Sequence, residues 1–149
     1  MKTVATISRL GPEEAAEEIF RAHEHESAWL DAFAVSLDRR RSGGSLARTF
    51  EVWDLSQAEA ARLFGVSRQA VGKWLRQGVP AERAAAVSDL AAATDLLVHY
   101  LKRDRIPAVV RRPIQSLGGV SLVNLLAQGD TRAVVAACRD MFRFERVHA

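Results

Sequence analysis

One short stretch, residues 55–80 (LSQAEAARLFGVSRQAVGKWLRQGVP), restricts the possible fold more than any other part of this 149-residue chain. Ser56 is a good N-cap for a helix, and Glu59 three residues later predicts a capping box. Gly65 follows where that helix must end, and glycine readily adopts the positive φ that such an end requires. Ser67 then offers the N-cap of a second helix. The stretch therefore predicts two short helices joined by a tight turn, which is the arrangement of a helix-turn-helix motif.

The apolar side chains of this stretch fall where the two helices, residues 57–64 and 68–77, would pack on each other. The small side chain of Ala61 suits a place where two helices cross closely, and Val66 would fill the corner between them. The inward positions are Ala60, Ala61, Phe64, Val66, Val71 and Trp74. The motif is therefore supported by caps, turn and packing positions that do not depend on one another.

The polar side chains of the second helix would point outward and suit DNA. Arginine binds guanine and glutamine binds adenine through paired hydrogen bonds in the major groove. Gly72 would allow close approach to a backbone or a base edge, while Lys73 and Arg76 suit phosphates. The predicted DNA-binding residues, which include two at helix starts, are Gln57, Ser67, Arg68, Gln69, Gly72, Lys73 and Arg76, with Arg68 and Gln69 as the base contacts.

Residues from about Leu46 to Pro80 resemble the helix-turn-helix domain of the phage-repressor (Xre-like) family. The resemblance implies a first helix at residues 46–53, followed by the positioning helix and the recognition helix described above. It also implies a homodimer that binds double-stranded operator DNA with two-fold symmetry. The alternative is a helical hairpin that does not bind DNA.

The residues before the motif predict helices and a linker. Residues 1–10 have the pattern of an extended or loose segment, and Pro12 suits the start of a helix. From there to about residue 38 the apolar positions fit either one long amphipathic helix or two shorter ones, for packing or dimerisation. Residues 39–45 (RRRSGGS) are the predicted linker, with Ser45 as the N-cap of the next helix. The three arginines suit either a solvated helix end or an arm that contacts the DNA backbone.

The residues after the motif also predict helices, so the expected fold class is all-α. Ala, Leu, Val, Arg and Glu dominate the composition, which favours helix, and no convincing strand is found. Pro107 and Pro113 should interrupt the chain after a helix over residues 81–101. The further expected features are a turn at Leu117-Gly118-Gly119, a helix at 122–127 capped by Ser121, and a last helix that is capped by Asp130 or Thr131 and runs to about Phe142.

Charge is unevenly distributed along the chain. Residues 1–40 carry five Lys or Arg and eight Asp or Glu, whereas the remainder carries sixteen and ten. A basic remainder suits a polyanionic partner such as DNA. Within it, residues 102–112 hold five basic side chains and one aspartate, which fits either a second phosphate-binding patch or a solvated face.

The C-terminal third resembles the toxin-binding domain of Xre/MbcA/ParS antitoxins. The features that carry this resemblance are Pro113, Leu-Gly-Gly at 117–119, Ser-Leu-x-x-Leu-Leu at 121–126, Gly129 and a terminal helix with Phe142. Together with the repressor-like part, the resemblance covers roughly residues 46–149. It divides the chain into an N-terminal extension with a linker (1–44), a DNA-binding region (45–101) and a toxin-binding or dimerisation domain (102–149).

The combined resemblance implies a type II antitoxin that neutralises a cognate toxin and represses its own operon. Many partners of such antitoxins are RES-type toxins, which consume NAD, and the antitoxin's C-terminal segment covers the toxin's cleft. The expected toxin-binding residues are Leu117, Gly118, Gly119, Phe142, Arg143, Phe144 and Arg146. A frayed terminus or a flap over the core is the other interpretation of the last residues.

Other classes of protein fit less well. Cys138, the only cysteine, excludes an intrachain disulfide and a cysteine zinc site and is expected to be a buried thiol. No stretch is apolar enough to span a membrane, no signal segment is found, and a cytoplasmic protein is expected. The four histidines form no metal-ligand pattern and no phosphate loop occurs, so neither catalysis nor a cofactor is expected. The remaining alternatives are a stand-alone dimeric transcription regulator and an interaction protein with a vestigial helix-turn-helix.

Overall fold

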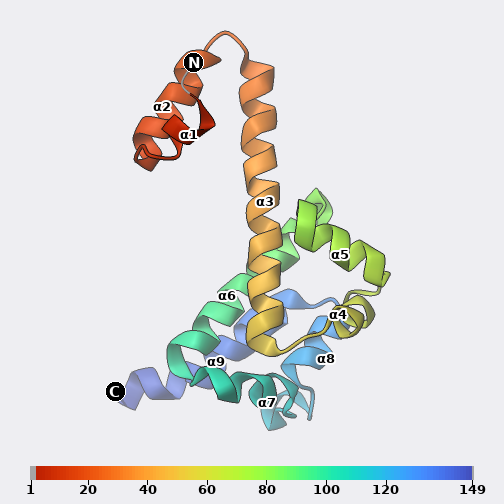
Figure 1. Ribbon diagram of the computed structural model, residues 1–149. Coiled ribbons are helices and arrows are strands. Elements are labelled where there is room, and N and C mark those ends of the chain that lie inside the picture. The colour runs from red at the N-terminus through yellow and green to blue at the C-terminus, as the bar shows by residue number, and fades with distance from the viewer. Residues whose placement is uncertain (1–2, 149) are drawn as a thin grey trace. The chain divides into compact units, whose positions relative to one another are not determined.

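The computed structural model describes the backbone of residues 3–148 and the side chains of residues 3–143. The described part is helical and holds no strand, only an isolated bridge between Ile114 and Val120. The expected all-α class is therefore confirmed. The chain divides into two compact units, residues 1–38 and 39–149, which are described separately below (Figure 1).

The first unit contains α1 (Val4–Ile7), α2 (Pro12–Ala22) and the beginning of α3 (Ser27–Trp53). The expectation of an extended segment over residues 1–10 is wrong, because the N–H groups of Ile7 and Ser8 bond to the carbonyls of Thr3 and Val4 and close one helical turn. The open choice over residues 12–38 is decided in favour of two helices. They are separated by a turn in which the N–H of Glu26 donates to the carbonyl of His23 (2.8 Å).

The predicted linker at residues 39–45 is wrong, because α3 runs through it without interruption to Trp53. Ser45 is consequently a mid-helix residue and caps nothing. The glycines serve a close approach instead: a Cβ on Gly43 would lie 2.9 Å from the carbonyl oxygen of Trp74. A Cβ on Gly78 would overlap with the carbonyl group of Arg39. Arg39 and Gly43 therefore lie on the side of α3 against which the end of α5 packs.

The second unit has one shared hydrophobic core. Its remaining helices are α4 (Gln57–Phe64), α5 (Arg68–Gln77), α6 (Ala84–Tyr100), α7 (Ile106–Arg111), α8 (Leu122–Ala127) and α9 (Thr131–His148). The long helices α6 and α9 pack on each other, and α8 packs against α4, α7 and α9. Fully buried side chains come from both sides of residue 101, including Leu46, Leu97, Leu122 and Val134. The regions 45–101 and 102–149 thus belong to one compact unit, and their separate roles stay a prediction.

Polar groups inside this core have partners. The indole N–H of Trp53, a fully buried residue of α3, donates to the hydroxyl of Thr94 on α6 (3.1 Å). Cys138 is buried, as expected, and burial raises the pKa of its thiol to about 12. The thiol is therefore protonated and poorly reactive at neutral pH.

The expected turns and caps after α7 are confirmed. Gly118 and Gly119 have φ values of 72° and 85°, which favour glycine, and Ser121 forms a capping box with Asn124 at the start of α8. Asp130, not Thr131, caps α9, because its carboxylate accepts the N–H of Ala133 (3.0 Å). The last helix also continues beyond Phe142, to His148.

Candidate nucleic-acid interface

The two helices expected from residues 55–80 are present with the predicted bounds. The Ser56 hydroxyl accepts the N–H of Glu59 (3.1 Å), and the Ser67 hydroxyl accepts the N–H of Ala70 (3.0 Å). Gly65 ends α4 in the left-handed conformation with φ 66°, as predicted. The N–H of Val66 donates to the carbonyl of Ala61 (3.0 Å), so the turn also satisfies a carbonyl at the end of α4.

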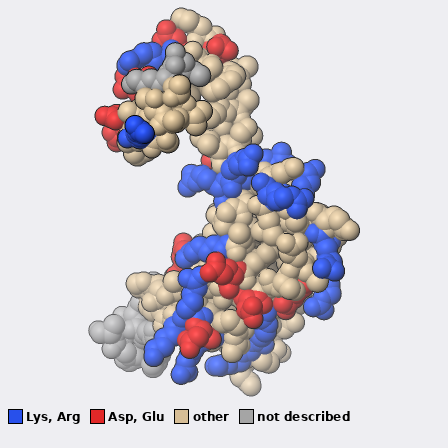
Figure 2. All heavy atoms as spheres, in the orientation of Figure 1, with Lys and Arg blue, Asp and Glu red and all other residues tan. Residues whose placement is uncertain are grey.

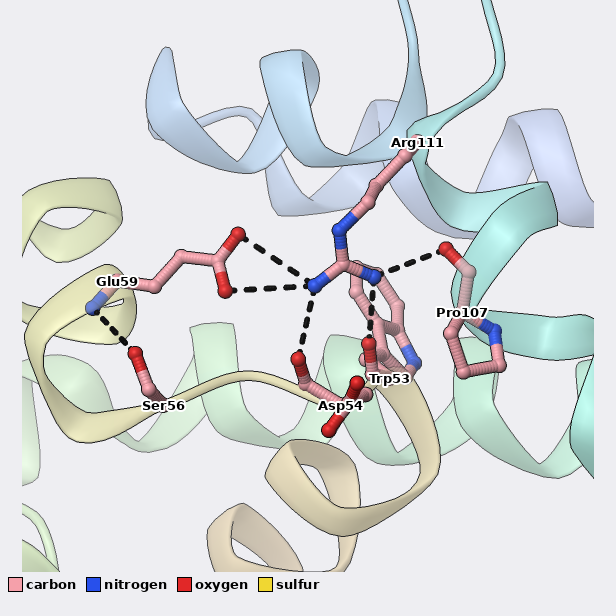
Figure 3. A network of polar contacts seen from close by, with 6 residues as sticks. All are labelled: Trp53, Asp54, Ser56, Glu59, Pro107 and Arg111. Atoms are coloured by element: carbon pink, nitrogen blue, oxygen red, sulfur yellow. Dashed lines mark hydrogen bonds and ion pairs between the residues drawn. The ribbon is translucent and has the colours of Figure 1, made fainter.

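Only half of the predicted capping box forms at α4. The Glu59 side chain does not return to Ser56 but lies 3.3 Å from Nη2 of Arg111, on α7 (Figure 3). The guanidinium of Arg111 also donates to the carbonyls of Trp53 (2.8 Å) and Asp54 (2.8 Å). Asp54 has φ 55°, the left-handed conformation that more often needs glycine. Arg111 therefore holds the end of α3 and the start of α4 together, a role that its sequence position does not suggest.

The inner side of α5 is held by aromatic packing. Val71 and Trp74 are buried, as predicted, and the Trp74 ring meets the Phe64 ring edge to face at 5.8 Å. The Arg83 guanidinium lies 5.3 Å from the centre of the Trp74 ring and donates to the carbonyl of Phe64 (3.3 Å). Arg83 thus contacts both helices of the pair. It is a positioning residue that the sequence interpretation missed.

The predicted polar residues lie at the start of α4 and along the outer side of α5. Gln57, Ser67, Arg68, Gln69, Lys73 and Arg76 are all exposed. Gly72 lies on the same side of α5 but is buried, because neighbouring side chains cover its backbone. A Cβ there would lie 3.2 Å from Nη1 of Arg76 and 3.5 Å from Oε1 of Gln57. Gly72 is therefore the floor of a shallow hollow of about 340 Å³, lined by Gln57, Arg68, Gln69, Gly72 and Arg76.

Charge on this part of the second unit is positive. Figure 2 shows Lys and Arg side chains gathered where α4 and α5 lie, and the sequence of α5 contains no acid. Arg39 adds to them, since its backbone and Cγ lie against Gly78 at the end of α5. The face combines positive charge with glutamine side chains and a recess, so it can take a phosphate backbone and base edges.

The basic segment at residues 102–112 is partly structural. Arg111 is used by the contacts described above, and Arg103 lies 3.4 Å from the Glu51 carboxylate on α3. Lys102, Arg105 and Arg112 are exposed. The two expected roles, a phosphate-binding patch or a solvated face, therefore remain open only for these three exposed side chains, because Arg103 and Arg111 make contacts within the protein.

The predicted partner-binding residues of the C-terminal third are not all at the surface. Leu117, Gly118, Gly119 and Arg143 are exposed, with Leu117 beside a small hollow between the turn and α9. Phe142 is 2% exposed and its ring stacks on that of Tyr100 at 4.6 Å, so it belongs to the core. The expectation that Phe142 contacts a toxin is therefore corrected. The side chains of Phe144 and Arg146 lie outside the described residues.

Two further features do not occur among the described residues. None of their helices has the length and apolar character needed to cross a bilayer. Nor does any cluster of three or more His, Cys, Asp or Glu side chains among them have the arrangement of a metal site.

Comparison with known proteins gives one structural likeness. No protein-family model matches the chain, and no curated protein sequence matches it significantly. One chain of the crystal structure of the M. tuberculosis MbcT-MbcA toxin-antitoxin complex is similar to it, with 22% sequence identity and a TM-score of 0.55. The match covers 66% of this chain and 91% of the other. The two chains share a helical fold.

Proposed function

We propose that this chain is the antitoxin of a type II toxin–antitoxin pair, which neutralises a cognate toxin and represses its own operon. The observation that carries the proposal is the fold shared, over 66% of the chain, with a chain of a toxin–antitoxin complex. The family resemblances of residues 46–149 support the same function and favour an NAD-consuming RES-type toxin. In this proposal the chain is no enzyme, needs no cofactor and acts in the cytoplasm.

The proposed DNA-binding element is the α4–α5 pair, acting as a helix-turn-helix. Arg68 and Gln69 would reach base edges, while Gln57, Ser67, Lys73 and Arg76 would contact phosphates. Gly72 supports this assignment, because the absence of a side chain there leaves a recess that a base edge or phosphate can enter, in line with the close approach expected from the sequence.

The proposed toxin-binding surface is the exposed turn at Leu117, Gly118 and Gly119, together with the exposed side of α9 that includes Arg143. Leu117 is 38% exposed and is the only large apolar side chain of the second unit with that much exposure among the described residues. Exposed apolar side chains beside a polar rim are typical of partner-binding sites.

The test is co-purification of the tagged chain with the product of the adjacent open reading frame. Because α9 packs on α6, removal of the C-terminal third would unfold the second unit, so point variants are needed. We expect Leu117→Arg to weaken capture of the neighbour at least about tenfold, and Ala92→Arg on an exposed side of α6 to leave it unchanged. If the wild-type chain captures nothing yet binds its upstream DNA, it is a stand-alone dimeric regulator instead.

A further inference from the structure

Exposed apolar side chains are concentrated in the first unit. Among the described residues, the large exposed hydrophobics of this unit are Val4, Phe20, Trp29, Val35 and Leu37, and Leu117 is the single one in the second unit. No described residue of the first unit is buried. A segment this short rarely buries enough surface to be stable alone. A partner surface that covers exposed side chains such as Trp29 and Leu37 would supply the missing burial.

The apolar residues of α3 form a regular stripe. Leu30, Phe33 and Leu37 are spaced by three and four residues, the pattern of a helix that packs along a second helix. Trp29 lies beside them and stacks on Phe33 at 5.2 Å and on His23 at 3.5 Å. These ring contacts hold the aromatic side chains in place before any partner binds, which lowers the entropy cost of association.

The stripe is self-complementary. An antiparallel copy of α3 centred on Phe33 would place Trp29 opposite Leu37 and Phe33 opposite its own copy. The same register places Glu26, just before the helix, opposite Arg40, which follows Leu37 by three residues. The Glu26 side chain is 59% exposed although it contacts His23 at 3.1 Å, so it is accessible to a second cation. Parallel pairing would instead oppose like charges at both ends.

We propose that residues 12–40 are a homodimerisation module in which the α3 helices of two copies pair antiparallel about Phe33. The apolar face of α2, which includes Ile19 and Phe20, would cover the pair from each side and form a four-helix arrangement. A two-fold axis on α3 is isologous, the commonest symmetry of protein dimers. The proposal goes beyond the function proposed above, because it holds whether or not the chain binds DNA or a toxin.

The first test is the mass of the full chain in solution, with two matched variants of the same helix. Phe33→Glu places a charge in the centre of the proposed interface, and Val35→Glu places the same charge on the opposite side of α3, where Val35 is 66% exposed. We expect the wild type and Val35→Glu to have twice the mass of one chain, and Phe33→Glu to dimerise at least about 100-fold more weakly. Circular dichroism checks that both variants keep their helices. A monomeric wild type, or a Phe33→Glu dimer as strong as that of Val35→Glu, overturns the proposal.

The second test is specific for the register. Phe33→Cys should form a disulfide-linked dimer under mild oxidation, whereas Val35→Cys should not, because only residue 33 faces its own copy. Cys138 should not interfere, since it is buried and its pKa is about 12. Glu26→Arg and Arg40→Glu should each weaken the dimer, and the double variant should restore it. Equal cross-linking at 33 and 35, or no restoration in the double variant, contradicts the antiparallel arrangement.

Discussion

Arg68 and Lys73 are both exposed residues of α5 but differ in what their side chains can do. Arg68 is the first residue of the helix and lines the recess above Gly72, where a planar guanidinium can meet a base edge. Lys73 is exposed and does not line the recess, and a flexible ammonium suits the phosphate backbone. Under the proposed function, Arg68 would therefore read the base sequence, and Lys73 would attract DNA of any sequence.

Alanine substitution should show this difference directly. Arg68→Ala should lower the affinity for the operator by about 1–3 kcal/mol while affecting unrelated DNA less, which reduces the preference between sequences. Lys73→Ala should weaken binding to all sequences and lower the salt slope by about one unit. Fluorescence anisotropy with specific and scrambled duplexes at several salt concentrations measures both. An equal loss on every sequence for Arg68→Ala would refute its role in reading bases.

At the scale of secondary-structure elements, the position of α5 depends on close backbone contacts between its C-terminal end and α3. The backbone at Gly78 lies against the backbone at Arg39, and Gly43 lies against the carbonyl of Trp74. The Ser42 hydroxyl accepts the N–H of Val79 (3.1 Å), which fixes the chain just after α5. Two glycines and one serine thus dock the end of α5 on the middle of a long helix.

The neighbouring glycines of α3 should respond in opposite ways to the same substitution. Gly43→Ala should destabilise the fold by about 1–3 kcal/mol, because its Cβ would press on the Trp74 carbonyl. Gly44→Ala meets no atom within 4 Å and should stabilise the fold by up to about 1 kcal/mol through better helix propensity. Urea denaturation followed by circular dichroism compares the free energies of unfolding. If Gly43→Ala is as stable as Gly44→Ala, the close packing of α3 and α5 is not as described.

At the scale of the molecule, Arg111 joins parts of the second unit that are far apart in sequence. It reaches from α7 to the end of α3 and the start of α4, and so connects the C-terminal third with the predicted DNA-binding helices (Figure 3). Most of this connection is made to backbone carbonyls, whose hydrogen bonds hold the turn at Asp54. The ion pair with Glu59 is partly exposed and should contribute less.

Substitutions at Arg111 should therefore cost more than substitutions at its neighbours. Arg111→Ala should lower the free energy of unfolding by about 1–3 kcal/mol, because the carbonyls of Trp53 and Asp54 lose their donor. Glu59→Gln should cost less than about 1 kcal/mol. Arg112→Ala, an adjacent exposed arginine, should stay within about 0.5 kcal/mol of the wild type and is the control. Thermal and urea unfolding of the three variants measure this order, and a loss at Arg112 equal to that at Arg111 would contradict it.

The local features of this protein could be predicted from its sequence. Caps at Ser56, Ser67 and Ser121, and the positive φ of Gly65 and Gly118, follow from backbone chemistry within a few residues, and they predicted α4, α5, α8 and the all-α class. The packing sides of these helices followed from their periodicity. The assignment of Arg68 and Gln69 to base contacts stays a prediction.

Features that depend on contacts between distant parts of the chain could not be predicted in this way. Gly43 and Gly44 look like a linker in isolation, although Gly43 continues the buried face of Leu46 and Phe50, a periodicity that could have indicated helix. The partner of Glu59 lies 52 positions away in sequence, and Phe142 is covered by Tyr100 of another helix. The physical reason is that helix ends are set by neighbouring backbone groups, whereas burial and ion pairing depend on which helices the whole fold brings together.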